Sequence, residues 1–344
     1  MSDPDSILSA GSAMAQRLER CVNGVVIGQA AAVRLLIIAV FARGHVMLQG
    51  DVGVGKTTLL RALARGLGGG FSRIEGSVDL MPNDLLYHAY IDRDGRPAIE
   101  PGPLTRAGDS LAVFFFNEIN RARPQVHALL LRAMAERSVQ AFNREVPLPL
   151  LQVFADRNRL EREETFEIAS AARDRFMMEI TVDAPSAEAD RRALVFDPRF
   201  HDSDALLAQV PEGVAPIGAL PALSQAIQAR VHCAPALQDY VLRLWDATAA
   251  PQRHGLRLDE RIPGLDVAGL MLAGASPRGM SQLLRAARVA AWLDGRLHVT
   301  PEDLRSVFAP VIAHRLCLQP VHELRRGDIV PLLIDELMAR VPVP

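Results

Sequence analysis

The chain has 344 residues, of which 49% are hydrophobic and 23% charged; this balance is typical of a globular protein with a sizeable core and excludes extensive disorder. The formal net charge of -2 excludes a general basic field for nucleic acid, so we expect no nucleic-acid partner and recognition through local surfaces. The length favours two domains over one.

Residues 1–16 lack the pattern of a secretory signal, and we expect them to form a short frayed tail. Between about residues 45 and 182, short runs rich in Val, Phe and Ile alternate with helical patterns, which predicts an α/β layer with a mostly parallel sheet. The predicted strands are residues 45–49, 71–75, 111–119, 152–156 and 176–182.

After residue 185 the strand signals stop, and the chain reads as helical. The predicted helices there are residues 186–195, 221–231, 237–249, 277–293 and 301–308. Thr300 and Asp303 have the spacing of a capped helix start. We therefore predict a first domain over residues 1–185 and an all-α second domain over residues 186–344.

A phosphate-binding loop is the strongest motif. Residues 50–57 read Gly-Asp-Val-Gly-Val-Gly-Lys-Thr and match GxxxxGK[ST] between a predicted strand and a predicted helix over 57–67. Glycines let backbone N–H groups face phosphates, and the helix N-terminus adds positive charge. Lys56, the one lysine among 38 basic residues, suits the β and γ phosphates, and the Thr57 hydroxyl suits Mg²⁺. ATP or ADP with Mg²⁺ is the predicted cofactor.

A hydrophobic strand ending in Asn117 and Glu118 has the form of a Walker B segment. Glu118 is predicted to act as the general base that polarises the attacking water. Asn117 stands where most such strands carry an aspartate that holds Mg²⁺ through water. An amide oxygen accepts a hydrogen bond from that water but brings no charge, so we predict weakened metal affinity and slow hydrolysis.

Four runs, at residues 26–29, 117–121, 130–137 and 274–278, together resemble the MoxR family of AAA+ ATPases. This family belongs to the helix-2-insert branch and is related to the ATPase subunit of magnesium chelatase. The resemblance extends from residue 26 to about residue 293. It implies a P-loop NTPase fold, with an AAA+ αβα nucleotide-binding domain and a helical lid.

The resemblance assigns roles to four polar residues besides the P-loop. Asn158 matches the sensor-1 asparagine that helps to position the water, although Arg159 stands where the family usually has proline. Arg175 matches an arginine finger that reaches the γ-phosphate of a neighbouring subunit, which implies a ring, in the simplest case a hexamer. Arg278 matches sensor 2, and Glu118, the predicted general base, is the second acid of the Walker B segment. The alternative for each is an ion-paired, solvated or strand-capping side chain.

The segment at residues 26–28 resembles the adenine-side segment of the family. The residues predicted to bind the nucleotide are Val26, Ile27, Gly28, Asp51, Val52, Gly53, Val54, Gly55, Lys56, Thr57 and Thr58.

Residues 87–101 and 139–148 read as hairpins, the first turning near Asp94 and Gly95. They resemble the helix-2 insert and the pre-sensor-1 hairpin of this branch, which implies that they couple nucleotide state to a partner. The alternative is two surface hairpins without a role in binding.

The family implies a chaperone-like ring that hydrolyses Mg-ATP to remodel or activate a protein client. Metal or cofactor insertion is one form of this activity, methanol dehydrogenase activation is its namesake, and the implied partner carries a von Willebrand factor A domain. Two alternatives stay open, a nucleotide-gated assembly or regulatory protein with weak hydrolysis and a magnesium-chelatase-like subunit. A DNA-directed motor is disfavoured by the near-neutral charge.

The cysteines Cys21, Cys233 and Cys317 are far apart and form no CxxC pair. This pattern predicts free thiols in a reducing compartment, and hence a cytoplasmic protein. The longest apolar runs, residues 35–42 and 111–116, are far shorter than the roughly 18 residues of a membrane helix, so we expect no membrane span.

Overall fold

The computed structural model describes residues 4–158, 166–258 and 261–344, which form two compact units. Unit 1 comprises residues 1–176 and 180–224, and unit 2 comprises residues 177–179 and 225–344. Unit 1 thus ends at Ser224 rather than at residue 185. The reason is that the helices after the last strand bury apolar side chains, such as Leu206 and Leu207, within it.

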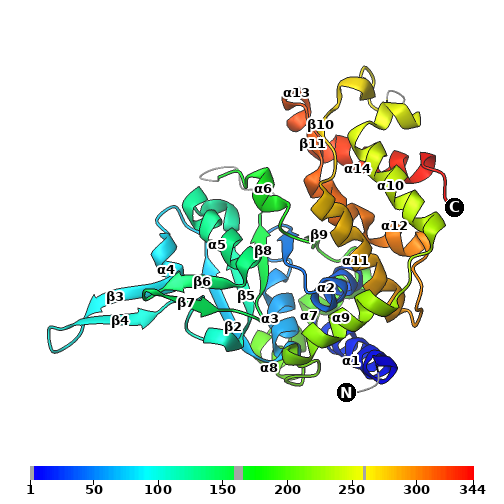
Figure 1. The fold of residues 1–344 in the computed structure, drawn as a ribbon. Coiled ribbons are helices and arrows are strands. Elements are labelled where there is room, and N and C mark those ends of the chain that lie inside the picture. Colours follow the sequence, from blue (N-terminus) through cyan, green and yellow to red (C-terminus); the bar gives the residue numbers. More distant parts are fainter. Residues whose placement is uncertain (1–3, 159–165, 259–260) are drawn as a thin grey trace. The chain divides into compact units, whose positions relative to one another are not determined.

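The core of unit 1 is a five-stranded sheet with the order β2-β5-β8-β1-β9 (Figure 1). The strands are β1 (Val46–Gln49), β2 (Gly70–Glu75), β5 (Leu111–Asn117), β8 (Gln152–Arg157) and β9 (Met178–Thr181). The pairs β2 with β5, β5 with β8, and β1 with β8 are parallel. All five predicted strands are therefore confirmed, and the third ends two residues early because Glu118 adopts a left-handed conformation.

Helices cover both faces of the interior strand β5, all seven of whose residues are buried. On one face, Phe114 and Phe116 pack in one cluster with Val126 and Leu130 of α5 (Pro124–Glu136). Alternation turns Phe115 to the other face, where α3 (Lys56–Leu67) contacts the strand. This packing holds the end of β5 in a fixed position beside the start of α3.

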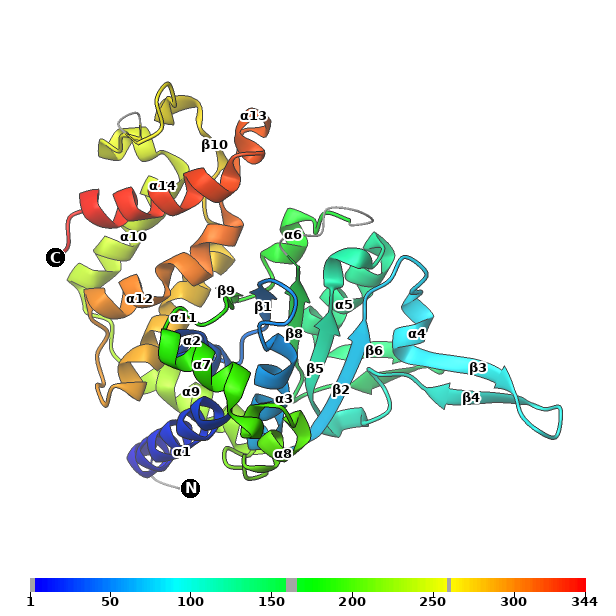
Figure 2. The same ribbon diagram turned by 180° about the vertical axis from the view of Figure 1, so that it is seen from behind.

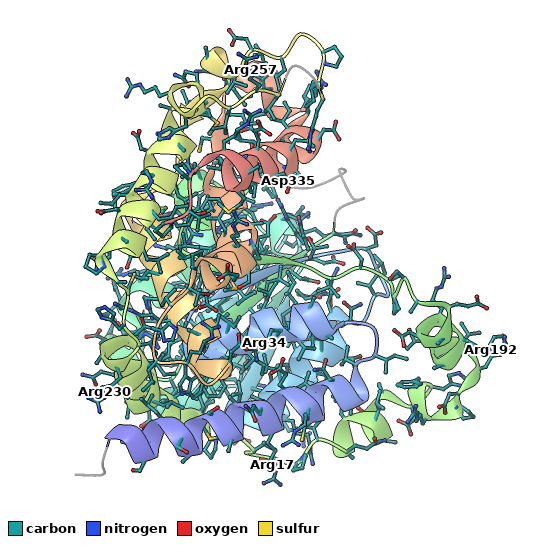
Figure 3. All side chains as sticks on the ribbon, turned by 90° about the vertical axis from the view of Figure 1, so that its right-hand side faces the viewer. Arg17, Arg34, Arg192, Arg230, Arg257 and Asp335 are labelled. Atoms are coloured by element: carbon teal, nitrogen blue, oxygen red, sulfur yellow. The ribbon has the colours of Figure 1, made fainter. Side chains whose placement is uncertain are left out.

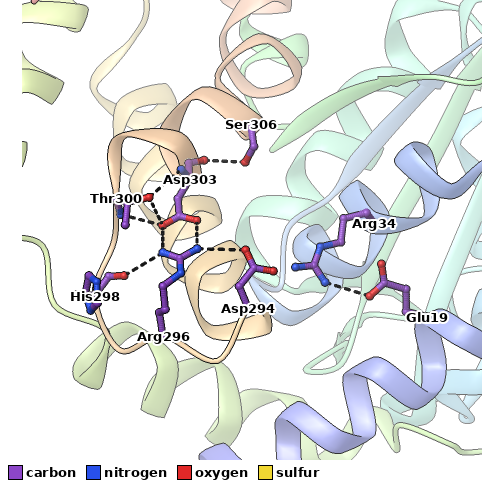
Figure 4. A network of polar contacts seen from close by, with 8 residues as sticks. All are labelled: Glu19, Arg34, Asp294, Arg296, His298, Thr300, Asp303 and Ser306. Atoms are coloured by element: carbon purple, nitrogen blue, oxygen red, sulfur yellow. Dashed lines mark hydrogen bonds and ion pairs between the residues drawn. The ribbon is translucent and has the colours of Figure 1, made fainter. Parts of the chain in front are cut away.

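The N-terminal segment is a helix, α1 (Pro4–Val25), so the expectation of a frayed tail is wrong. Its apolar face buries Leu18 against α3, while Arg17 points outward (Figure 3). Glu19 of α1 accepts a hydrogen bond of 3.0 Å from Arg34 of α2 (Ala30–Phe41) (Figure 4). The buried residues of α1 recur at helical spacing, and this spacing was the sequence signal for a helix.

Both predicted hairpins are present in unit 1 (Figure 1). The first, β3 (Tyr87–Ile91) with β4 (Pro97–Pro101), follows the short helix α4 (Pro82–Leu86). The second, β6 (Ser138–Ala141) with β7 (Arg144–Pro147), turns at Phe142 and Asn143, which have φ angles of 56° and 57°. Positive φ at both central positions is the geometry of a two-residue hairpin turn.

The helices between β8 and unit 2 are α6 (Ser170–Arg173), α7 (Glu188–Phe196), α8 (Ser203–Ala208) and α9 (Leu220–Arg230). Figure 2 shows α8 beside α3, and the two helices are in contact. Backbone bonds tighten this packing, since Gly213 N–H donates to Arg65 O and Ala215 N–H donates to Gly66 O. These segments, as far as Ser224 within α9, therefore belong to the sheet-containing unit.

Unit 2 is helical, as predicted, apart from one short antiparallel pair that the sequence did not reveal, β10 (Met271–Ala273) with β11 (Cys317–Leu318). Its helices are α10 (Pro235–Ala249), α11 (Pro277–Leu293), α12 (Pro301–Ile312), α13 (Pro320–Glu323) and α14 (Arg326–Arg340). The predicted cap is confirmed, because Thr300 and Asp303 form a reciprocal capping box at the start of α12.

Asp303 also makes a two-point contact with Arg296, at 2.6 and 2.7 Å (Figure 4). The carboxylate is buried and receives the Thr300 N–H as well. We predict that Asp303→Ala lowers the free energy of unfolding by about 2 kcal/mol, since it removes the Asp303 half of the capping box and leaves the partly buried Arg296 guanidinium without this carboxylate. Urea unfolding measures this. Asp294→Ala is the matched control, because Asp294 contacts the same Arg296 from the surface and its loss should cost under about 1 kcal/mol.

Candidate active site

Three strands of unit 1 end at the same edge of the sheet. Gln49 of β1 is in register with Arg157 of β8, and Phe116 of β5 is in register with Ala155 of β8. Because the pairs are parallel, the predicted P-loop, the Asn117-Glu118 pair and the residues around Asn158 all follow carboxyl ends of adjacent strands. Ligands of open α/β sheets bind at this edge.

The loop between β1 and α3 has the conformation that a phosphate cradle needs. Gly53 and Gly55 have φ angles of 81° and 89°, and neither has an atom within 4 Å of the place where a Cβ would lie. Gly50, in contrast, lies directly against the carbonyl oxygen of Val182, which leaves no room for a side chain. Helix α3 then begins at Lys56. The free N–H groups of a helix start fit a polyphosphate, and the adjacent Thr57 hydroxyl fits the Mg²⁺ that accompanies it.

Lys56 is buried at the base of the loop, with 9% of its surface exposed. Its Nζ donates to the carbonyl oxygens of Gly50 at 2.6 Å and Asp51 at 3.2 Å, and lies 3.4 Å from Oδ2 of Asp156. The ammonium is thus held by groups that lie beside the expected phosphates. A narrow side chain is required here, because the surrounding space is filled.

We predict that Lys56→Arg lowers ATP turnover by at least about 10²-fold and weakens the binding of a fluorescent ATP analogue. The broader guanidinium does not fit between the loop carbonyls and Asp156. Arg61→Lys, a reverse exchange at an exposed position of the same helix, is the control and should leave both measurements unchanged. Normal turnover in Lys56→Arg would contradict the packing argument.

Asp156 joins the three strand ends and was not among the predicted site residues. Its Oδ1 accepts the Glu118 N–H at 2.5 Å, and its Oδ2 faces Lys56. Burial raises the pKa of the Asp156 carboxyl above its ordinary value, while the Glu118 N–H and the Lys56 ammonium oppose the rise. An acid in the strand-end run Ala155-Asp156-Arg157-Asn158 was the available signal.

Asn117 is buried between the carboxylate of Asp156 and the guanidinium of Arg73. The orientation of its amide that satisfies both has the nitrogen donating to Asp156 Oδ1 at 3.3 Å and the oxygen accepting from Arg73 at 3.3 Å. Asn117 therefore contacts the carboxylate of the neighbouring strand directly.

Glu118 stands just beyond the strand, with a φ of 53°. A left-handed conformation in a residue other than glycine is strained and persists where the surroundings enforce it. Here Asp156 binds its N–H, and Gly76 leaves room for its carbonyl oxygen. The side chain lies 3.1 Å from Arg121, one turn further along the chain. The backbone of the predicted general base is thus linked through Asp156 to Lys56 of the P-loop.

The other three predicted polar residues have different surroundings. Asn158 is buried and follows β8 directly, whereas Arg159 lies outside the described residues. Arg175 lies between α6 and β9, where it donates to the Ala171 carbonyl at 3.0 Å. Arg278 belongs to unit 2, where it is exposed in the first turn of α11 behind the Ser276 cap.

A cavity of about 440 Å³ opens beside the P-loop. Of the predicted residues it is lined by Val26, Ile27, Val52, Gly53, Val54, Gly55 and Thr58. Gly28, with a φ of 71°, turns the chain against Pro185. The remaining apolar wall was not predicted and comes from Pro185, Leu194, Val195, Phe200 and Leu206. A mainly apolar hollow next to a phosphate loop is suited to a purine base.

No helix in the described part of the chain is long and apolar enough to cross a membrane. Residues 45–178 match the family described as "ATPase family associated with various cellular activities (AAA)", and residues 267–331 match the "AAA lid domain".

Among curated proteins, "Protein MoxR" of Methylorubrum extorquens is 58% identical over 99% of this chain and 98% of its own length. "Chaperone MoxR1" of Mycobacterium tuberculosis is 33% identical over 94% of this chain and 80% of its own length. A crystal structure of a candidate ATPase from Cytophaga hutchinsonii matches with a TM-score of 0.84 at 26% identity, covering 99% of this chain and 98% of that one.

Proposed function

The chain belongs to the MoxR family of AAA+ ATPases, and we propose that it hydrolyses Mg-ATP in a ring to remodel or activate a protein client. The observation that carries the proposal is the meeting of the P-loop, Glu118 and a base-sized cavity at one sheet edge. A relative named as a chaperone supports the client part of the proposal.

The residues of unit 1 divide the work of the reaction. Backbone N–H groups of residues 53–57 bind the phosphates, and Lys56 turns from the loop carbonyls to the β and γ phosphates. Thr57 and, through water, Asn117 would hold Mg²⁺, and the ion would neutralise phosphate charge. Glu118 accepts a proton from the attacking water, which Asn158 helps to orient.

Two arginines complete the proposed site. Arg175 acts on the γ-phosphate of a neighbouring subunit, which requires a ring, most simply a hexamer. Arg278 senses the γ-phosphate from the lid. Since Asn117 itself brings no charge to the metal, slow hydrolysis is part of the proposal unless a neighbouring residue supplies that charge.

The proposed surroundings follow from the family. The partner is a protein with a von Willebrand factor A domain, and the client is an enzyme that matures by metal or cofactor insertion, of which methanol dehydrogenase is an example. Free cysteines at three positions support a cytoplasmic location. A magnesium-chelatase-like role shares this site and differs only in the client.

The hairpin β3–β4 is the proposed contact for the client. Tyr90, Ile91 and Ile99 are each more than half exposed on it, so it has apolar surface to offer. The two ends of the hairpin are held together by a backbone bond outside residues 88–100, because Gly102 N–H donates to Leu86 O. We predict that replacing residues 88–100 by a short Gly-Ser turn preserves basal ATP turnover and abolishes client activation. Equal loss of both activities would contradict this role.

The test of the proposed function is steady-state ATP turnover over a range of protein and Mg²⁺ concentrations. A ring enzyme shows a specific activity that rises with protein concentration, and Lys56→Ala removes it. If ATP binds but is not hydrolysed at any concentration, the nucleotide-gated assembly function replaces the proposal. If neither binding nor turnover occurs, the assignment of the site is wrong.

A further inference from the structure

The position expected to carry the metal-holding acid is neutral, yet a carboxylate lies beside it. Asn117 ends β5, and Asp156 stands next to it on β8, because Phe116 and Ala155 are register partners. With the Asn117 amide in the orientation that satisfies both of its partners, its nitrogen lies 3.3 Å from Oδ1 of Asp156. The negative charge at this edge of the sheet thus comes from the neighbouring strand.

Asp156 is also oriented toward the phosphate site. Its Oδ2 lies 3.4 Å from Lys56 Nζ, and that ammonium stands at the base of the P-loop. Only 2% of Asp156 is exposed to solvent. A buried carboxylate that loses its cationic partner is strongly destabilised unless a new positive group takes its place.

Nucleotide binding would take the cationic partner, Lys56, away from the Asp156 carboxylate. When Lys56 moves to the phosphates of ATP, the Asp156 carboxylate loses the ammonium at 3.4 Å and keeps only the Glu118 N–H and the longer-range charge of Arg73. The Mg²⁺ that accompanies ATP would supply such a positive group beside Asp156, held through its waters. Mg²⁺ sites with few protein ligands are held largely through such waters, so a carboxylate need not contact the metal directly.

Resting on the proposed function, we propose that Asp156 supplies the negative charge of the magnesium site that Asn117 lacks. The carboxylate that such a site usually carries at the end of β5 is supplied here from the end of β8. Asn117 keeps the shape of the usual side chain and donates its amide to Asp156, so it helps to orient the carboxylate. On this view Asn117 and Asp156 form one functional unit.

The test is the affinity of a fluorescent ATP analogue measured by fluorescence, in EDTA and over a series of MgCl₂ concentrations. The ratio of the two affinities is the Mg²⁺ enhancement of binding. Asp156→Asn keeps an oxygen for the Glu118 N–H but removes the charge. We expect it to lower the Mg²⁺ enhancement about tenfold and to leave binding in EDTA unchanged or slightly tighter, because Lys56 is released.

The double variant Asn117→Asp/Asp156→Asn returns the acid to β5 and should restore the enhancement to within about threefold of the unmodified chain. Asn117→Asp alone brings two carboxylates into contact, so one of them stays protonated and little is gained. Circular dichroism of each variant shows that it is folded, and the double variant keeps the test valid if Asp156→Asn alone is unstable.

Two results would overturn the inference. One is an unchanged Mg²⁺ enhancement in Asp156→Asn, and the other is an equal loss of binding with and without Mg²⁺, which would mean that Asp156 only supports the local structure. Both differ from failure of the proposed function, in which the unmodified chain would bind the analogue no better than Lys56→Ala does.

Discussion

Arg175→Ala lowers ATP turnover about 10³-fold and leaves ATP affinity within about threefold of the unmodified chain. A guanidinium that meets the γ-phosphate only as charge develops contributes to the transition state rather than to binding, and such fingers are worth about 10³ to 10⁵ in rate. Arg173→Ala is the matched control, since it removes an arginine of the same loop at the end of α6. Its turnover should stay within a few-fold.

A mixing experiment decides whether Arg175 acts across an interface. Arg175→Ala and Glu118→Gln subunits are each inactive alone, but in a mixed ring an intact Glu118 meets an intact Arg175 from a neighbour. Random mixing should recover about a quarter of the normal rate, since both subunits of an interface must be of the right kind. No recovery, or full turnover by a monomer at high dilution, would rule out a finger in trans.

Glu118→Gln lowers turnover about 10²- to 10⁴-fold while ATP still binds, because the amide cannot accept the proton of the attacking water. The residue keeps its backbone contact to Asp156, so the loop geometry is preserved. The measurement is single-turnover hydrolysis with ATP trapped on the protein. ATP that stays intact on Glu118→Gln for many normal turnover times is the expected outcome.

The control for Glu118→Gln is a variant that breaks the ion pair of Glu118 with Arg121. Arg121→Ala removes the contact at 3.1 Å but not the carboxylate, so turnover should change by only a few-fold. If Arg121→Ala were as inactive as Glu118→Gln, the pair rather than the carboxylate would be the essential feature. Turnover by Glu118→Gln at the normal rate would exclude Glu118 as the general base.

Features that depend on neighbouring residues were readable from the sequence. The P-loop is eight consecutive residues with glycines where the backbone needs positive φ, and its flanking strand and helix are contiguous with it. The strands show as short apolar runs, and the hairpins as alternating arms around turn residues. The family and the P-loop fold follow from these signals, and the relatives confirm the family.

Errors arose where a local signal was weak. The expectation of a frayed tail fails at α1 because two positions of its apolar stripe, Gly11 and Ala15, carry small side chains that weaken the sequence signal. The division near residue 185 marked the end of strands rather than the end of a unit. Helices α7 and α8 continue unit 1, and their apolar side chains close the base-sized cavity.

The sequence by itself determined the phosphate loop, the strand-end acid Glu118 and the alternation of strands and helices, because each is encoded within a few residues. Only the tertiary structure decided that Asp156 meets Lys56 and Asn117, and which helices wall the cavity. Those contacts join residues from about 40 to 180 positions apart, through the strand order β5-β8-β1 and the helices that follow β9. Strand order depends on the packing of the whole sheet, which no short segment specifies.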